Sequence, residues 1–240
     1  MAELQLSLSY ANPNSGPSAN RIGWINWGNF AITQDETDSV TIPLPNGQVI
    51  TFDVTNTIAA GDGLTILSDV PLLNSAFGTL GYTNIPGNIA LEAFDDYQAC
   101  TGNSSTLTLS NISVKDSLGR SIKSYSFVLA SIQVANGSEP LVGPQEVQTF
   151  TTSGRRWRQL IWLGNTSSPV VNEITPKSIS IYPILKNSGS PVYTTNSPGE
   201  ISVNISGCNL IPQFAIGIII NPIRSKKISA PTRGANLFKN

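Results

Sequence analysis

The chain has 240 residues, of which 40% are hydrophobic and 12% are charged, and its formal net charge is −1 at pH 7. This hydrophobic content is enough for a sizeable core, and the low, balanced charge argues against binding to nucleic acid or to a membrane surface. No run of about 18 apolar residues occurs, so we expect no transmembrane helix, and residues 1–10 lack the basic and apolar regions of a secretory signal.

Short runs rich in β-branched and aromatic residues, separated by turn residues, predict about a dozen strands. Residues 4–10 (LQLSLSY) alternate strictly and predict the first strand. The pair Asn46-Gly47 predicts a tight hairpin before the strand 48–54. Residues 106–114 alternate through Leu109 and then change phase at Ile112, which predicts a β-bulge. A turn at 116–121 follows, and further strands are predicted within 121–134, 146–152, 157–163, 178–185, 200–206 and 213–220.

One short helix is predicted over residues 68–78, with Ser68 or Asp69 as N-cap, Pro71 in the first turn and Gly78 as the stop. Neither a composition shift nor an internal repeat marks a second domain. The pattern therefore predicts an all-β protein, an antiparallel β-sandwich or jelly-roll, in one domain over residues 1–223. Residues 224–240 lose the hydrophobic pattern, and we expect them to form a flexible basic tail or an arm.

The amino-acid composition argues against a catalytic site. The chain has no histidine, which excludes Ser-His and Cys-His pairs, and it has no phosphate loop or dinucleotide fingerprint. We therefore expect a protein that is not an enzyme and carries no cofactor. The carboxylates of Glu92, Asp95 and Asp96 leave three readings open, namely solvated charges, a structural calcium site or a glycosidase pair. Cys100 and Cys208 are either two buried thiols or a disulfide.

The tryptophans carry the stronger signal. Trp24 and Trp27 stand three residues apart, a spacing that places their rings on opposite faces of a regular strand. We expect Trp27 to share the core face with Ile25 and Trp24 to be exposed, with packing of Trp24 beside Ile22 as the alternative. Farther along, Trp157 is flanked by Arg155, Arg156 and Arg158. Exposed aromatic rings beside Arg and Asn are suited to stacking on sugar rings or to anchoring an interface.

Four stretches, taken in order, resemble a known family. They are RIGWINWGNFAI followed by GQVITFDVTN (21–32 and 47–56), TLTLSNISVKDSLGRSIKSYSFVLA (106–130), EVQTFTTSGRRWRQL (146–160), and GEISVNISG with QFAIGI (199–207 and 213–218). Together they are similar to the second non-repetitive domain of CshA-type surface adhesins. The chain departs from this family at residues 131–139 (SIQVANGSE), where the family often carries an Asp-x-Glu pair.

The resemblance implies a lectin-like β-sandwich at a bacterial surface that binds a host glycoprotein or glycan. The alternative is a structural subunit of a surface filament, appendage or layer, whose copies associate through strand edges. Either reading implies an extracellular location, at the surface of a bacterial cell or spore, with no nucleic-acid partner and no membrane insertion. The residues predicted to bind the ligand are Trp24, Asn26, Trp27, Arg155, Arg156, Trp157, Glu92, Asp95 and Asp96.

Overall fold

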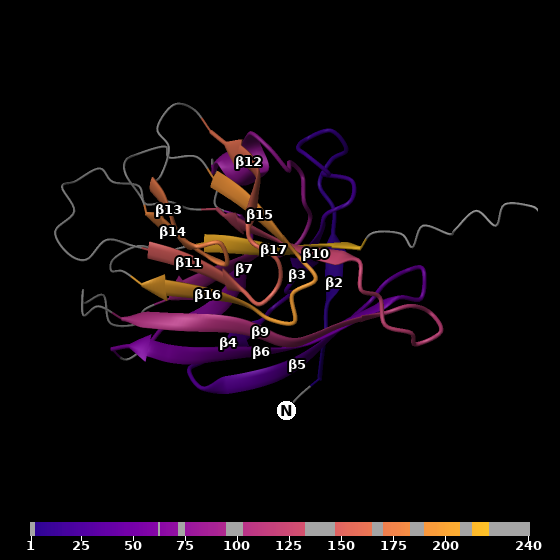
Figure 1. Cartoon of the computed structure of the whole chain (residues 1–240), viewed down its shortest axis with the longest axis horizontal. Helices are drawn as coiled ribbons and strands as arrows, with labels where there is room; N and C mark the ends of the chain where they lie inside the picture. The colour runs from indigo at the N-terminus through magenta and orange to yellow at the C-terminus, as the bar shows by residue number, and fades with distance from the viewer. Residues whose placement is uncertain are drawn as a thin grey trace, which may run out of the picture.

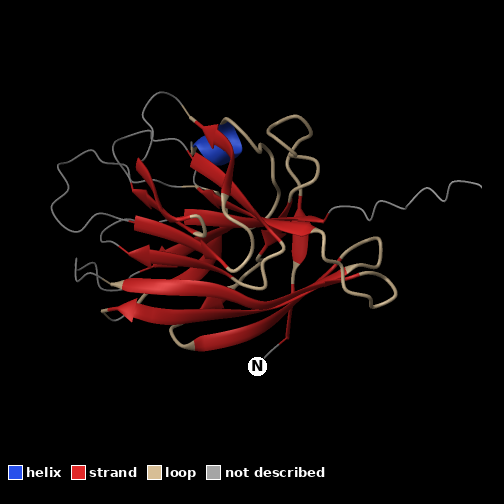
Figure 2. Cartoon of the chain, in the orientation of Figure 1, coloured by secondary structure: helices blue, strands red, loops and turns tan. Residues whose placement is uncertain are grey.

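The computed structural model describes residues 3–61, 63–71, 75–94, 103–132, 147–164, 170–182, 190–206 and 213–220. Regular structure in these residues is almost entirely β (Figures 1 and 2). The strands form two sheets that pack against each other, so the predicted all-β sandwich is confirmed. Cys100, Cys208 and the predicted tail at 224–240 lie outside the described residues. No helix in the described part is long and apolar enough to cross a membrane.

The first sheet has eight strands in the order β1-β5-β6-β9-β16-β11-β14-β13. Neighbouring strands are antiparallel except for β1, which runs parallel to β5. The strands are β1 (Glu3–Gln5), β5 (Glu36–Pro43), β6 (Val49–Ala60), β9 (Ser104–Lys115), β11 (Val147–Thr152), β13 (Val170–Thr175), β14 (Ser178–Tyr182) and β16 (Ile201–Ser206).

The second sheet has the order β12-β15-β10-β17-β8-β7-β4, and β3 joins it by pairing with β17 on one side and β2 on the other. The strands are β2 (Ser7–Ser9), β3 (Gly23–Asn26), β4 (Ala31–Ile32), β7 (Thr65–Asp69), β8 (Ala90–Phe94), β10 (Tyr125–Ser131), β12 (Arg158–Leu163), β15 (Ser190–Asn196) and β17 (Gln213–Ile220). One edge of β17 is shared, because Ala215 pairs with Ala90 of β8 whereas Gly217 pairs with Trp24 of β3.

The N-terminal segment belongs to both sheets. The alternation at 4–10 predicts one strand, but Glu3–Gln5 pairs with β5 in the first sheet and Ser7–Ser9 pairs with β3 in the second. Leu6 lies between them, and its N–H donates to the carbonyl of Thr41 at 3.0 Å. The alternation itself persists, since Leu4, Leu6 and Leu8 all pack against the core between the sheets. The segment therefore joins the two sheets at one border of the sandwich.

Two hydrophobic cores explain why so many strands are apolar on both faces. The main core lies between the sheets and includes Phe52, Phe127 and Ile216. A second core covers the other face of the second sheet, where Val128 and Ala215 pack under residues from the segments at 11–22 and 76–89. A strand covered on both faces has no solvent face to keep polar. β10 and β17 are therefore buried almost throughout.

The predicted helix over 68–78 is wrong in position and length. Ser68 and Asp69 end strand β7, and the helix α1 covers only Ala76–Thr79. Even this turn is irregular, because Phe77 has ψ 127° and Gly78 has φ 88°. Phe77 is buried in the second core, so its tertiary packing sets the local backbone more strongly than helix propensity does.

The predicted bulge is confirmed in β9. Thr51 pairs with Ser113 and Asp53 pairs with Ser110, so β9 carries one more residue than β6 between these pairs. Asn111 has φ 53° there, and its Nδ2 donates to Asp53 Oδ2 at 2.8 Å. Ser39 donates to Asp53 Oδ1 at 2.8 Å from the neighbouring strand. Both hydrogen bonds lower the pKa of Asp53, and the bond from Asn111 has the larger effect.

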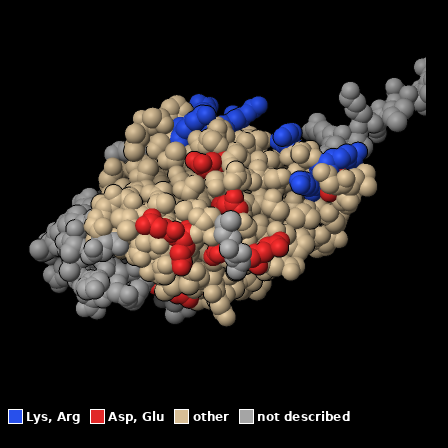
Figure 3. Space-filling model, turned by 90° about the horizontal axis from the view of Figure 1, so that it is seen from below, with Lys and Arg blue, Asp and Glu red and all other residues tan. Residues whose placement is uncertain are grey.

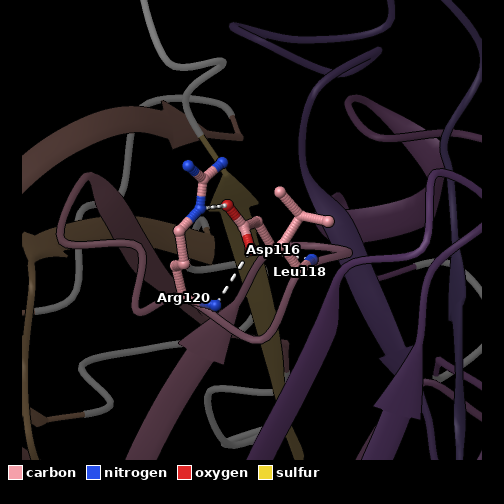
Figure 4. A network of polar contacts seen from close by, with 3 residues as sticks. All are labelled: Asp116, Leu118 and Arg120. Atoms are coloured by element: carbon pink, nitrogen blue, oxygen red, sulfur yellow. Dashed lines mark hydrogen bonds and ion pairs between the residues drawn. The ribbon is translucent and has the colours of Figure 1, made fainter.

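Both predicted turns form at one end of the sheet. The hairpin between β5 and β6 closes where Gln48 O accepts from Leu44 N at 2.8 Å, and Gly47 supplies φ 77°. The turn at 116–121 is organised by one carboxylate (Figure 4). Asp116 Oδ1 accepts from the backbone N–H groups of Leu118 and Arg120, and Oδ2 accepts from Arg120 Nε at 2.7 Å. The backbone N–H of Arg120 is the main reason that the pKa of Asp116 is lowered.

Candidate functional site

The three tryptophans predicted to bind a ligand are all buried. Trp24 and Trp27 are 0% and 1% exposed, and Trp157 is 7% exposed. The predicted exposure of Trp24 is therefore wrong. The spacing argument itself holds, since Trp27 packs with Ile25 in the main core while Trp24 lies in the second core. Neither face of this strand is exposed to solvent, because the main core covers one and the second core covers the other.

The surroundings of the rings leave them no free face for a ligand. Trp24 meets Phe77 and Tyr82 edge-on, at centroid distances of 4.9 and 5.3 Å. Trp27 lies 5.0 Å from Phe30. Trp157 lies 6.3 Å from Phe150 in the main core. Stacking on a sugar from solution would require these cores to open, so we assign the rings to packing.

The arginines beside Trp157 are exposed. We call residues 153–158 the arginine loop; it leaves β11 in the first sheet and enters β12 in the second. Arg155, Arg156 and Arg158 all project to solvent from it. Lys177, from the turn between β13 and β14, joins them, because its Nζ donates to Ser153 O at 3.2 Å. Four cationic side chains therefore belong to one end of the sandwich.

The backbone of the arginine loop is fixed by hydrogen bonds to three other segments. Ser153 Oγ accepts from the N–H groups of Gly199 and Glu200 at 3.0 and 2.9 Å. Arg155 N donates to Asn196 O at 3.2 Å, and Arg155 O accepts from Thr195 Oγ1. Trp157 N donates to Pro176 O at 2.9 Å. The guanidinium groups therefore extend from a rigid base, which lowers the ordering cost of binding.

These cations have no acidic partner within the described residues, where the only ion pair joins Asp116 and Arg120. Glu200 adjoins the loop, since its backbone N–H donates to Ser153 Oγ, but other acidic side chains lie apart from it. Glu3, Asp35, Glu36 and Asp38 belong to β1, β5 and the turn before β5. Figure 3 views the molecule from this side, and Asp and Glu gather in the middle of that view while Lys and Arg lie along its margins. The segregation leaves the arginine loop free to attract anionic groups.

Glu92 stands apart from the arginine loop. It lies on β8, while Arg158 begins β12, and three strands separate these two in the second sheet. At ~4.8 Å per strand the separation is about 19 Å. Asp95 and Asp96 lie outside the described residues. Among the residues that are described, no group of three or more His, Cys, Asp or Glu side chains is arranged to hold a metal. The predicted ligand-binding set therefore does not form one site.

Glu92 has a local environment of its own. Its Oε2 accepts from Gln213 Nε2 at 2.9 Å. Burial raises the pKa of Glu92, the hydrogen bond from Gln213 opposes the rise, and the nearby carboxylate of Asp69 adds to it. Asp69 lies on the neighbouring strand β7. The hydrogen bond from Gln213 offsets part of the cost of burying this carboxyl group. The described arginines and tryptophans of the predicted ligand-binding set do not lie beside it.

Asn26 lines a cavity at the border where β1 gives way to β2. The cavity has a volume of about 390 Å³ and is lined by Gln5, Leu6, Ser7, Asn26, Gly28 and Pro43. We call it the border groove. No local pattern in the sequence singles out Gln5, Ser7 or Pro43, because their proximity to Asn26 depends on the crossover of the chain between the sheets. Lys177 was missed for a similar reason, since a turn between two strands brings it to the arginine loop.

A family model described as "Surface adhesin CshA non-repetitive domain 2" matches residues 20–219. No relative among curated proteins matches the chain. Among solved structures, the chain is similar to the N-terminal domain of the Streptococcus gordonii adhesin Sgo0707, with a TM-score of 0.44 and 10% sequence identity. That similarity covers 89% of this chain and 55% of the other, so this chain spans about half the length of the streptococcal one.

Proposed function

Because the chain belongs to the family of the second non-repetitive domain of the CshA surface adhesin, we propose that it is a non-enzymatic adhesion domain that binds a host glycoprotein or glycan. The family supports a role in adhesion at the cell surface. The observation that carries the choice of contact surface is the arginine loop, where exposed Arg155, Arg156 and Arg158 lack ion-pair partners among the described residues.

The ligand class follows from the chemistry of the guanidinium group. Arginine binds carboxylate and sulfate oxygens through two parallel hydrogen bonds, and it remains charged at any physiological pH. Three arginines on a fixed backbone favour a ligand with several acidic groups, such as a sialylated or sulfated glycan chain. Buried Trp157 contributes by holding the loop in place, since it anchors the end of the loop in the main core.

The test is binding of the purified chain to immobilised sialylated glycoprotein and to heparin, before and after enzymatic removal of the acidic sugars. We expect binding that weakens with salt and falls at least tenfold in Arg155→Ala/Arg156→Ala. The matched control is Lys115→Ala/Lys123→Ala, which removes two exposed cations outside the loop. Equal losses in the two double variants would contradict a specific site, as would binding that ignores removal of the acidic sugars.

A second candidate function is association between copies in a surface filament or layer. The observation that favours it is the same segregation of charge, with acidic residues near the β1 edge of the first sheet and the arginine loop elsewhere. An acidic edge and a basic loop on one chain suit a head-to-tail contact. Sedimentation velocity over a range of protein and salt concentrations tests it. A monomer under all of these conditions would eliminate this candidate and leave the adhesion proposal standing.

A further inference from the structure

The border groove is a concave and uncharged surface built by three separate parts of the chain. Gln5, Leu6 and Ser7 come from the crossover between β1 and β2, Asn26 and Gly28 from the end of β3, and Pro43 from the end of β5. One wall therefore belongs to the first sheet and the other to the second. A volume of about 390 Å³ falls within the range of small-molecule sites in proteins.

The lining combines two amides, one hydroxyl and two apolar side chains, and none of the lining residues is charged. Gln5, Ser7 and Pro43 are exposed, so their side chains are accessible from solvent. Amide and hydroxyl groups both donate and accept hydrogen bonds. Such a set matches neighbouring hydroxyl groups on a ligand, while Leu6 and Pro43 offer a surface for its C–H groups.

Hydrogen bonds hold the wall of the groove formed by residues 26–28 in one conformation. Asn26 Oδ1 accepts from Gly28 N at 3.2 Å, which sets the orientation of the amide. The carbonyl of Gly28 accepts from Ser68 Oγ at 2.8 Å and from Asn88 Nδ2 at 2.7 Å. The N–H of Trp27, between these residues, donates to Asn88 O at 2.9 Å. A wall fixed by four hydrogen bonds needs little reorganisation on binding.

Gly87 restricts the position of the side-chain amide of Asn26. Its φ is +87°, and a Cβ atom at this position would lie 2.3 Å from Asn26 Nδ2. The amide therefore packs directly against the backbone of Gly87. This contact provides an independent way to displace Asn26 without removing its chemistry.

We propose that the border groove binds an uncharged sugar residue, held by hydrogen bonds from Gln5, Ser7 and Asn26. The site goes beyond the proposed function and is separate from the arginine loop, because four strands lie between β1 and β11 in the first sheet. No aromatic ring is among the described residues that line the groove, so we expect weak binding, with a dissociation constant in the millimolar range.

The experiment uses the full chain labelled with ¹⁵N, titrated with the methyl glycosides of glucose, galactose, mannose and N-acetylglucosamine. We expect saturable chemical-shift changes at the backbone amide of Gly28 and the side-chain amides of Gln5 and Asn26. Asn26→Leu removes the hydrogen-bonding groups at similar size and should reduce the affinity at least fivefold. Gly87→Ala displaces the same amide and should have a similar effect.

Two further variants keep the test decisive. Gln5→Ala/Ser7→Ala alters only exposed side chains, so it answers the question even where Asn26→Leu fails to fold. Arg155→Ala/Arg156→Ala should leave the shifts at the groove unchanged, which separates this site from the proposed function. The proposal is overturned if no neutral glycoside shifts these amides, if the shifts survive in Gln5→Ala/Ser7→Ala, or if N-acetylneuraminic acid binds the groove more tightly than the neutral sugars.

Discussion

Trp24 of β3 lies opposite Gly217 of β17, and its indole occupies the space where a larger residue would carry a side chain. A Cβ atom at Gly217 would lie 3.0 Å from Trp24 Cε3 and 2.7 Å from Ile22 Cγ2. The glycine therefore permits the close approach that seats Trp24 between the sheet and the covering segments. The second core depends on this pair, because Trp24 also contacts Phe77 and Tyr82.

Gly217→Ala should destabilise the protein by about 1–3 kcal/mol, since the added methyl group overpacks a filled core. Urea unfolding monitored by circular dichroism measures the change. Gly199→Ala is the matched control, because the nearest atom to its Cβ would be Ser153 Oγ at 3.7 Å. Equal stability of the two variants would show that the indole has room to move away from β17.

Truncating either buried ring should cost far more than truncating an exposed arginine. We expect Trp24→Ala and Trp27→Ala each to lower the free energy of unfolding by about 3–5 kcal/mol. Arg156→Ala should stay within about 0.5 kcal/mol of the wild type. The conservative Trp24→Phe should remain folded and behave as the wild type does in the binding test with sialylated glycoprotein. A loss of binding in folded Trp24→Phe would show that Trp24 takes part in ligand binding.

Two substitutions at Asn111, in the bulge of β9, distinguish the effect of backbone strain from that of the side-chain hydrogen bond. Asn111→Ala and Asn111→Gly both lose the bond to Asp53, but only alanine is strained at φ 53°. We expect the alanine variant to be less stable by about 1 kcal/mol, as measured by chemical denaturation. No difference between the two would mean that the extra residue of β9 can move to another position.

The same variants should change how Asp53 titrates. In the wild type its pKa is lowered, so its stabilising contribution is present above the pKa of the unfolded chain and is lost as the pH falls through the lower folded value. Without Asn111 the pKa of Asp53 should rise toward its ordinary value, and the acid-side loss of stability should become smaller. NMR titration of the carboxyl carbon follows this change. A pKa that stays low in both variants would leave Ser39 as the dominant partner.

Glu92→Gln should stabilise the protein at neutral pH. The folded pKa of Glu92 is raised, so its contribution to stability is largest below the unfolded pKa and decreases as the pH rises through the folded value. Glutamine keeps an acceptor for Gln213 and removes the repulsion with Asp69. We expect a higher Tm at pH 7 and no gain near pH 4, measured by scanning calorimetry. Glu3→Gln, which changes the net charge equally at an exposed position, is the control for the change in net charge.

The strand pattern and the bulge could be predicted because both follow from local alternation. The phase change at Ile112 was visible in the sequence, and the extra residue at Asn111 is its direct result. The turns at Asn46-Gly47 and Asp116 were equally local, since a glycine with positive φ and a carboxylate that accepts backbone N–H groups are short-range features. The family was also accessible, because its motifs recur in order along the chain.

The burial of Trp24 could not be read from the sequence. Its cover comes from residues such as Ala19, Phe77 and Tyr82, which lie in segments without a regular pattern. The border groove was hidden for a related reason. Residues 4–10 alternate without interruption, and nothing local to them indicates that Leu6 is where the chain changes sheets. In both cases the deciding contacts join residues that are distant in sequence.

The passage of residues 3–9 from one sheet to the other has a consequence for local opening. Because one extended segment pairs with β5 and with β3, its release would expose the edges of both sheets in a single event. The amide protons of β1 and β2 should therefore share one opening free energy in hydrogen exchange, although they belong to different sheets. A sugar bound in the border groove touches both halves of this segment, so it should slow exchange in β1 and β2 together.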